Sequence, residues 1–184
     1  MPLIFTALRK IVKEIGMFKR IMLRFRDMKT ISKLISGAEE QAHINGKEEP
    51  GAEHFVLSAL NLDDGSAKRV FERMDANAEK FKSAISQQYT DALSSIGFDN
   101  VNEISSEAIQ SNKIFHNSQP SGQTLVKSLY TLKQRDKHRP LLSAHVISVA
   151  SEMEYGVVAR AFRAMGVDSK QLARLIKEEL ESQH

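Results

Sequence analysis

The sequence predicts an all-α protein of about eight to ten helices, built as a tandem, pseudo-two-fold repeat of four-helix units with an extra amphipathic helix at the N-terminus. The chain aligns with itself without a gap when it is shifted by 91 positions. In the 32-residue window that begins at His54, the shift gives seven identities, where average residue usage would give about two. The identical pairs are His54/His145, Ala59/Ala150, Gly65/Gly156, Arg69/Arg160, Phe71/Phe162, Met74/Met165 and Ile85/Ile176. We therefore predict an internal duplication.

Both copies contain a short amphipathic helix that follows a glycine. Gly65 and Gly156 stand where an apolar run ends, which is typical of a glycine that takes a left-handed conformation after a helix. After each glycine, apolar residues recur at i, i+3, i+4 and i+7, which predicts one apolar helical face per copy. These residues are Ala67, Val70, Phe71 and Met74 in the first copy and Val158, Ala161, Phe162 and Met165 in the second. A helix is expected to begin directly after each glycine.

Residues 1–29 are predicted to form a basic amphipathic extension of one or two helices, with Gly16 as a candidate interruption. They hold eight basic and two acidic side chains, a net charge of +6, which leaves −3 for the rest of a chain whose total is +3. Their apolar residues continue along one helical face to Ile21, Met22, Phe25 and Met28. We favour an interpretation in which this face packs on the body. The alternative is a helix that docks on a partner protein or an anionic membrane surface.

The first repeat, residues 30–88, is predicted to contain four helices. The first ends before Pro50, and the second begins near Ala52. The third spans about 66–75, and Asn77 is a candidate N-cap for the fourth. Each helix shows an apolar face with helical spacing, so the unit is expected to bury a core of its own.

The rest of the chain is predicted to be a connector, residues 89–119, and a second repeat, residues 120–184. The connector is rich in Ser, Asn and Gly and is the least regular part of the sequence. In the second repeat, Ser143 is a candidate helix cap, and Asp168 begins a capping-box pattern. The charged run at 177–181 is interpreted as a solvated helix end.

The repeated motifs resemble those of a known family. Residues 51–60 read Gly-Ala-Glu-His-x-x-Leu-x-Ala-Leu, and a short acidic turn and Ala-x-Arg-Val-Phe follow at 61–71. The second copy reads His-Val-Ile-Ser-Val-Ala at 145–150 and Gly-Val-Val-Ala-Arg-Ala-Phe at 156–162. This pattern resembles the N-terminal repeat domain of Clp ATPases, a tandem repeat of four-helix units that precedes the unfoldase modules. The resemblance implies a Clp N-type fold, here without the ATPase module.

The resemblance also implies a site. In some members of the family, the glutamate before the repeat histidine helps to bind phosphorylated arginine on substrates, and this role carries over to Glu53 only, because the second copy has Ala144. We therefore list Glu53 and His54 as candidate protein-binding residues. The alternative, which we favour, is that Glu53 stabilises a helix N-terminus through the helix dipole. Both repeat histidines are expected to be structural hydrogen-bonding groups within a signature of His54, Gly65, Arg69, Phe71, His145, Gly156, Arg160 and Phe162.

No motif for catalysis is present. Gly46-Lys47 lacks the other residues of a phosphate-binding loop, no Gly-x-Ser-x-Gly elbow occurs, and no two histidines have the spacing of a helical metal site. The absence of cysteine agrees with a cytoplasmic location. We predict a chain that is not an enzyme and has no cofactor or metal.

The predicted function is a non-catalytic protein-binding domain of the Clp unfoldase/protease system, and its partners are substrates, adaptors or Clp ATPase and protease components. The pattern of the basic segment does not favour nucleic acid. One alternative is a peripheral membrane or scaffold protein that works through residues 1–29. Another is a fragment of a longer ATPase, which the extra N-terminal segment disfavours.

Overall fold

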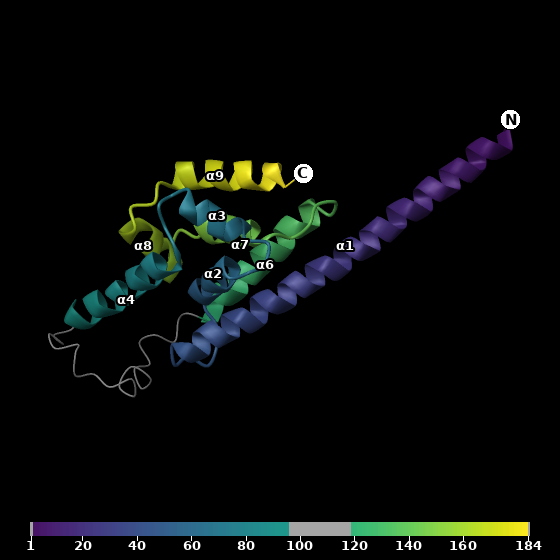
Figure 1. The fold of residues 1–184 in the computed structure, drawn as a ribbon. Helices are drawn as coiled ribbons and strands as arrows, with labels where there is room; N and C mark the ends of the chain where they lie inside the picture. Colours follow the sequence, from purple (N-terminus) through teal and green to yellow (C-terminus); the bar gives the residue numbers. More distant parts are fainter. Residues whose placement is uncertain (1, 96–118, 184) are drawn as a thin grey trace.

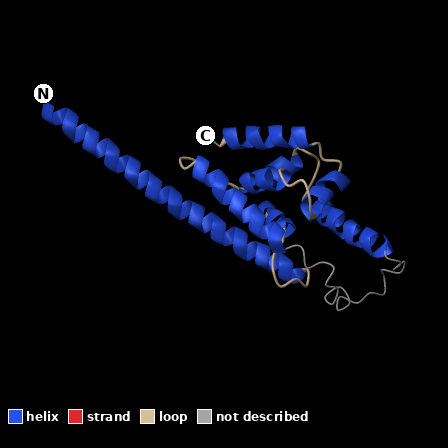
Figure 2. Cartoon of the chain, turned by 180° about the vertical axis from the view of Figure 1, so that it is seen from behind, coloured by secondary structure: helices blue, strands red, loops and turns tan. Residues whose placement is uncertain are grey.

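Every element in the part of the chain that the structure describes is a helix, as predicted. The computed structural model describes residues 2–95 and 119–183, and side chains are described from residue 21 onward, with gaps at 89, 92–95 and 119. These two segments form eight helices and include no strand (Figure 2). They are α1 (Pro2–Ile44), α2 (Ala52–Leu60), α3 (Ser66–Glu72), α4 (Ala78–Ser95), α6 (Gln119–Arg135), α7 (Ser143–Ser151), α8 (Val157–Ala164) and α9 (Ser169–Ser182).

Helix α1 joins the predicted N-terminal extension to the first helix of the first repeat without a break. It runs through Gly16 and across the predicted boundary at residue 30 for 43 residues, which is about 65 Å. Its C-terminal part packs on the body, and its N-terminal part projects away from it (Figure 1). The same shift of 91 positions places α6 over residues 28–44 of α1. The division of the chain into four domains stays a prediction, and residues 96–118 of the connector lie outside the described part.

The favoured prediction for the apolar face of the extension is wrong for its described side chains. Ile21, Met22, Phe25 and Met28 are exposed, at 45–65% of their full accessible area, and do not pack on the body. The body instead contacts the opposite side of α1. At 100° per residue, that side carries the buried residues Asp27, Leu34, Ala38 and Ala42.

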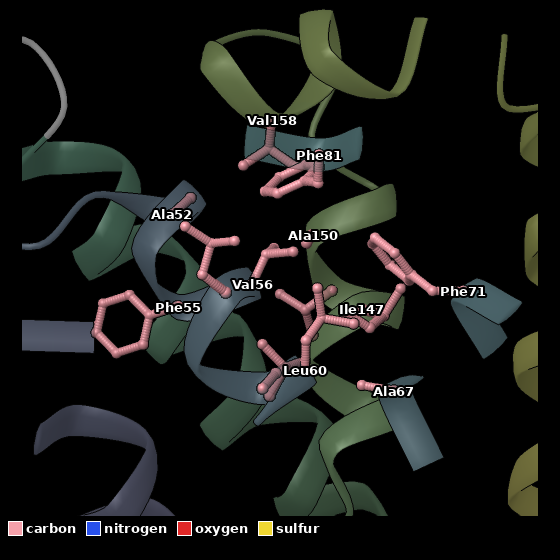
Figure 3. Packing of buried hydrophobic residues seen from close by; sticks show 14 of the residues in the cluster. Ala52, Phe55, Val56, Leu60, Ala67, Phe71, Phe81, Ile147, Ala150 and Val158 are labelled. Carbon is pink, nitrogen blue, oxygen red and sulfur yellow. The ribbon is translucent and has the colours of Figure 1, made fainter. Parts of the chain in front are cut away.

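Helices α2 and α7 lie side by side at the centre of the fold. All nine residues of α2 are buried, and so are seven of the nine residues of α7. Figure 3 shows Val56 and Leu60 of α2 near Ile147 and Ala150 of α7, with aromatic rings from other helices around them. Because these helices are the second elements of the two repeats, the two halves share one core.

The third and fourth helices are exchanged between the halves. Helix α3 of the first repeat packs on α9 of the second, and α8 of the second packs on α4 of the first. Rings from three of these helices meet in the core: the centroids of Phe71 and Phe81 are 6.0 Å apart, those of Phe71 and Phe162 are 6.2 Å apart, and those of Phe81 and Phe162 are 5.7 Å apart. Neither half therefore buries its own apolar faces alone.

Most of the predicted helix starts are confirmed. Gly65 has φ 63° and Gly156 has φ 97°, and α3 and α8 begin at the next residue in each case. Both angles lie in the region that favours glycine. Asn77 accepts a hydrogen bond from the Lys80 amide at 2.8 Å, and Asp168 accepts one from the Gln171 amide at 2.7 Å. These side chains occupy corresponding positions 91 residues apart.

Ser143 is not the N-cap that the sequence predicted. The cap position of α7 belongs to Leu142, and the Ser143 hydroxyl contacts α3 of the other half instead. It accepts from the Ala67 amide at 2.9 Å, while the Ser66 hydroxyl accepts from the Ala144 amide at 2.9 Å. The Asp64 carboxylate joins the two helix starts, because it accepts from the Ser143 amide at 2.6 Å and from the Ser66 amide at 3.2 Å. We call this arrangement the serine junction.

Candidate protein-binding site

The two repeat histidines make the same hydrogen bond at the start of corresponding helices. Nδ1 of His54 accepts from the amide of Gly51 at 2.9 Å, and Nδ1 of His145 accepts from the amide of Leu142 at 3.0 Å. Each ring thereby satisfies a backbone donor that the first turn of a helix cannot satisfy by itself. Since Nδ1 is the acceptor, the ring proton of a neutral imidazole lies on Nε2. The two environments correspond, as an internal duplication requires.

Burial keeps both imidazoles neutral. Loss of hydration lowers the pKa of His54 from 6.5 to about 4, and the nearby Glu53 carboxylate opposes this shift only in part. The pKa of His145 is also lowered, again mainly by burial. Neutral rings that accept an amide hydrogen bond act as helix caps and do not transfer protons near pH 7.

Acid is therefore expected to destabilise the fold through His54. The pKa of His54 in the folded chain is about 4 and its ordinary value is 6.5, so between these values the unfolded chain binds the proton more readily. The contribution of the neutral His54 ring to the free energy of unfolding is fully present above pH 6.5 and is lost as the pH falls towards 4. It amounts to something on the order of 3 kcal/mol. Urea unfolding measured across this range should show the decline.

Two matched variants isolate this effect. His54→Gln keeps an acceptor for the Gly51 amide but cannot titrate, so it should flatten the decline between pH 6.5 and 4. His138→Gln removes an exposed histidine and should leave the decline unchanged. A decline of the same size in His54→Gln would show that other groups cause it.

Glu53 is buried beside His54 and is not exposed to a partner. Its Oε1 atom lies 2.9 Å from the Nζ of Lys47 and 3.8 Å from Nδ1 of His54. Its Oε2 atom has no hydrogen-bond partner among the described residues, and neither has Nε2 of His54. The corresponding Ala144 is fully buried as well. The binding role that the resemblance implies for Glu53 stays a prediction, and the contacts observed are those of a group at a helix start.

The signature arginines bridge the exchanged helices. Nε of Arg69 in α3 donates to Oε1 of Glu179 in α9 at 2.8 Å. Nε of Arg160 in α8 donates to Oε1 of Gln88 in α4 at 3.0 Å. Glu179 and Gln88 are also 91 residues apart. The interpretation of 177–181 as a solvated end is thus wrong for Glu179, which is 6% exposed, because helix exchange places it against α3.

A cavity opens beside His145 in the second half. Its volume is about 480 Å³, and its wall combines apolar and charged side chains from α6, α7, α9 and the loop between α6 and α7. The apolar part includes Leu132, Leu142, Val149 and Leu180, and Arg135, Asp136, Arg139 and Glu152 are the charged residues that line it. Asp136 pairs with Arg139 at 3.4 Å. Residues 135–139 read Arg-Asp-Lys-His-Arg, but no pattern in the sequence indicates that they border a cavity.

The described residues offer no site for a metal ion. No group of three or more His, Asp or Glu side chains suited to a metal occurs in residues 2–95 or 119–183. None of the helices described is both long and apolar enough to cross a membrane. What the arrangement does provide is a helical body with a cavity of mixed polarity.

Comparison with known families agrees with the motif at the start of the first repeat. Residues 29–111 match the model of the Clp repeat (R) N-terminal domain, a domain that is non-catalytic. The match begins one residue before the predicted first repeat, extends into the predicted connector and ends before α6, so the helices of the second half lie outside it. No curated protein and no solved structure matches the chain.

Proposed function

Because the chain carries a Clp repeat (R) N-terminal domain at residues 29–111, we propose that it is a non-catalytic protein-binding module of the Clp unfoldase/protease system. It recognises substrates, adaptors or components of a Clp complex. The family match carries this proposal, since domains of this family mediate protein–protein interactions in Clp systems. The cysteine-free sequence agrees with a cytoplasmic setting.

The cavity beside His145 is the part of the body that best fits a peptide segment. Apolar side chains such as Val149 and Leu180 can receive an apolar residue of the partner, and Arg135 is exposed on its wall. A guanidinium in this position favours a partner with a carboxylate next to its apolar residue. Recognition of this kind needs shape and charge and does not require a reacting group.

His54 and His145 support this function indirectly. Each fixes the start of a central helix, and one of these helices, α7, forms part of the cavity wall. A preformed wall lowers the entropy cost of binding. His54 therefore contributes to recognition by holding its helix in place, whereas His145 also lines the cavity.

Crosslinking with mass spectrometry in native extract tests the proposal. The wild-type chain should recover a Clp ATPase, a Clp protease subunit or a substrate of that protease, with crosslinks that map to α6 and α7. A variant with Thr131→Glu and Arg135→Glu changes two exposed residues of the cavity wall and should lose most of this recovery. The matched control, Arg163→Glu with Lys170→Gln, makes the same change of net charge at exposed residues away from the cavity and should retain the recovery. Absence of Clp components from the wild-type sample would count against the proposal.

A further inference from the structure

One face of α1 carries a concentration of exposed apolar side chains. Nine large apolar residues are exposed in the described part of the chain, and six of them lie on α1 between residues 21 and 35. We call these six the outer stripe: Ile21, Met22, Phe25, Met28, Ile31 and Ile35, which are 37–65% exposed. A continuous apolar surface of this kind is unusual on a protein without a binding partner.

The outer stripe faces away from the body. At 100° per residue, its six side chains cover about half of the helix circumference, and the buried residues Leu34 and Ala38 lie on the other half. Ile31 and Ile35, which are 37% exposed, border the side that contacts the body. Figure 1 shows α1 along one edge of the molecule, with all other helices on one side of it. A flat surface can therefore contact the outer stripe between Ile21 and Met28 without meeting the body.

Basic side chains accompany the outer stripe. Residues 1–29 carry a net charge of +6, and Arg24, Arg26 and Lys29 are exposed close to the apolar residues. Neither Arg24 nor Arg26 forms an ion pair within the part of the chain that the structure describes. Long basic side chains beside an apolar helical face can reach lipid head groups while the apolar residues enter the acyl boundary.

A second copy of the chain is a poorer occupant. A parallel coiled coil through Ile21, Phe25 and Met28 would place Arg24 of one copy beside Lys29 of the other, and these like charges repel. A coiled-coil seam is also narrow, whereas the outer stripe covers about half of the helix. Width and charge together favour a broad anionic surface.

We propose that the outer stripe binds the surface of an anionic lipid bilayer, with α1 lying in the plane of the interface and the helical body on the aqueous side. The helix lies on the membrane and does not cross it, in keeping with the absence of any described helix suited to span one. This attachment is separate from the proposed recognition of Clp partners, because the outer stripe shares no residue with the cavity beside His145. It would concentrate the binding module at a membrane.

Vesicle flotation with the full chain tests the proposal. Wild-type protein should bind vesicles of phosphatidylcholine and phosphatidylglycerol and should not bind vesicles of phosphatidylcholine alone. A variant with Phe25→Glu and Met28→Glu should bind the anionic vesicles at least about tenfold more weakly, because two apolar contacts are replaced by repelled charges. The matched control is Tyr130→Glu with Tyr155→Glu, which adds the same charge at exposed aromatic residues off α1. The control should keep most of the binding.

Three outcomes would overturn the proposal. The first is wild-type protein that does not float with anionic vesicles. The second is an equal loss in both double variants, which would show a response to net charge and not to the outer stripe. The third is a wild-type dimer, seen by sedimentation equilibrium and lost in the α1 variant, without vesicle binding, which would assign the stripe to a second copy. Circular dichroism should show that both variants keep the helix content of the wild type.

Discussion

Phe71→Ala is expected to lower the free energy of unfolding by about 3–5 kcal/mol. The Phe71 ring is fully buried and meets the edges of Phe81 in α4 and Phe162 in α8. Its removal leaves a cavity where helices of both repeats converge, and their backbones are held by other contacts, so the cavity cannot close completely. Urea unfolding followed by far-ultraviolet circular dichroism measures the loss.

Phe25→Ala is the control for this prediction. Phe25 is 64% exposed on α1, so the same truncation should change stability by no more than about 0.5 kcal/mol. A double-mutant cycle between Phe71 and Phe162 should give a coupling of about 0.5–1.5 kcal/mol, since the two rings lie in different repeats and touch edge to face. A zero coupling would contradict the observed contact between the halves.

Asp64→Ala is expected to cost about 2–3 kcal/mol. The Asp64 carboxylate accepts hydrogen bonds from the amides of Ser143 and Ser66 and from both hydroxyls, so its removal leaves donors at two helix starts without a charged acceptor. The effect should appear as a single shifted unfolding transition, because the serine junction connects the two repeats.

Asp63→Ala provides the comparison in the adjacent position. The Asp63 carboxylate is largely exposed and forms an ion pair with Lys33, and a surface pair of this kind contributes roughly 0–1 kcal/mol. If the two alanine variants were equally stable, the serine junction would not be a significant connection between the repeats.

The helix starts were accessible from the sequence because their causes are local. Gly65 and Gly156 have positive φ, and a helix begins directly after each of them. The side-chain oxygens of Asn77 and Asp168 cap helices by accepting hydrogen bonds from the amides three residues later. Such signals depend on a few neighbouring residues and on backbone sterics. They identify where helices begin but not how helices pair.

How the helices pack on one another could not be predicted in this way, because packing does not depend on neighbouring residues alone. An apolar stripe shows that a helix face is buried, and it does not show which helix covers it. The exchange of third and fourth helices explains why Glu179 is buried and why Ser143 contacts α3 rather than capping its own helix. Periodicity alone likewise suggested that Phe25 packs on the body, although the direction of α1 places it outside.

The candidate site, too, could be predicted from the sequence only in part. The repeated motif predicted the Clp repeat family and the corresponding histidines, because both are visible as residue identities. The cavity beside His145 depends on the spacing between α6, α7 and α9, and no local pattern in the sequence records this spacing. Arg135 could be identified as charged, but its place on a cavity wall follows only from the fold.

Native-state hydrogen exchange tests most directly whether the two repeats form one body. The central amides of α2, around Val56–Leu60, and those of α7, around Ile147–Ala150, should open with the same free energy, equal to that of global unfolding. Phe71→Ala should lower both values by the same amount. If the amides of one helix opened at a lower free energy while those of the other kept their protection, the halves would be independent domains and the exchanged architecture would be wrong.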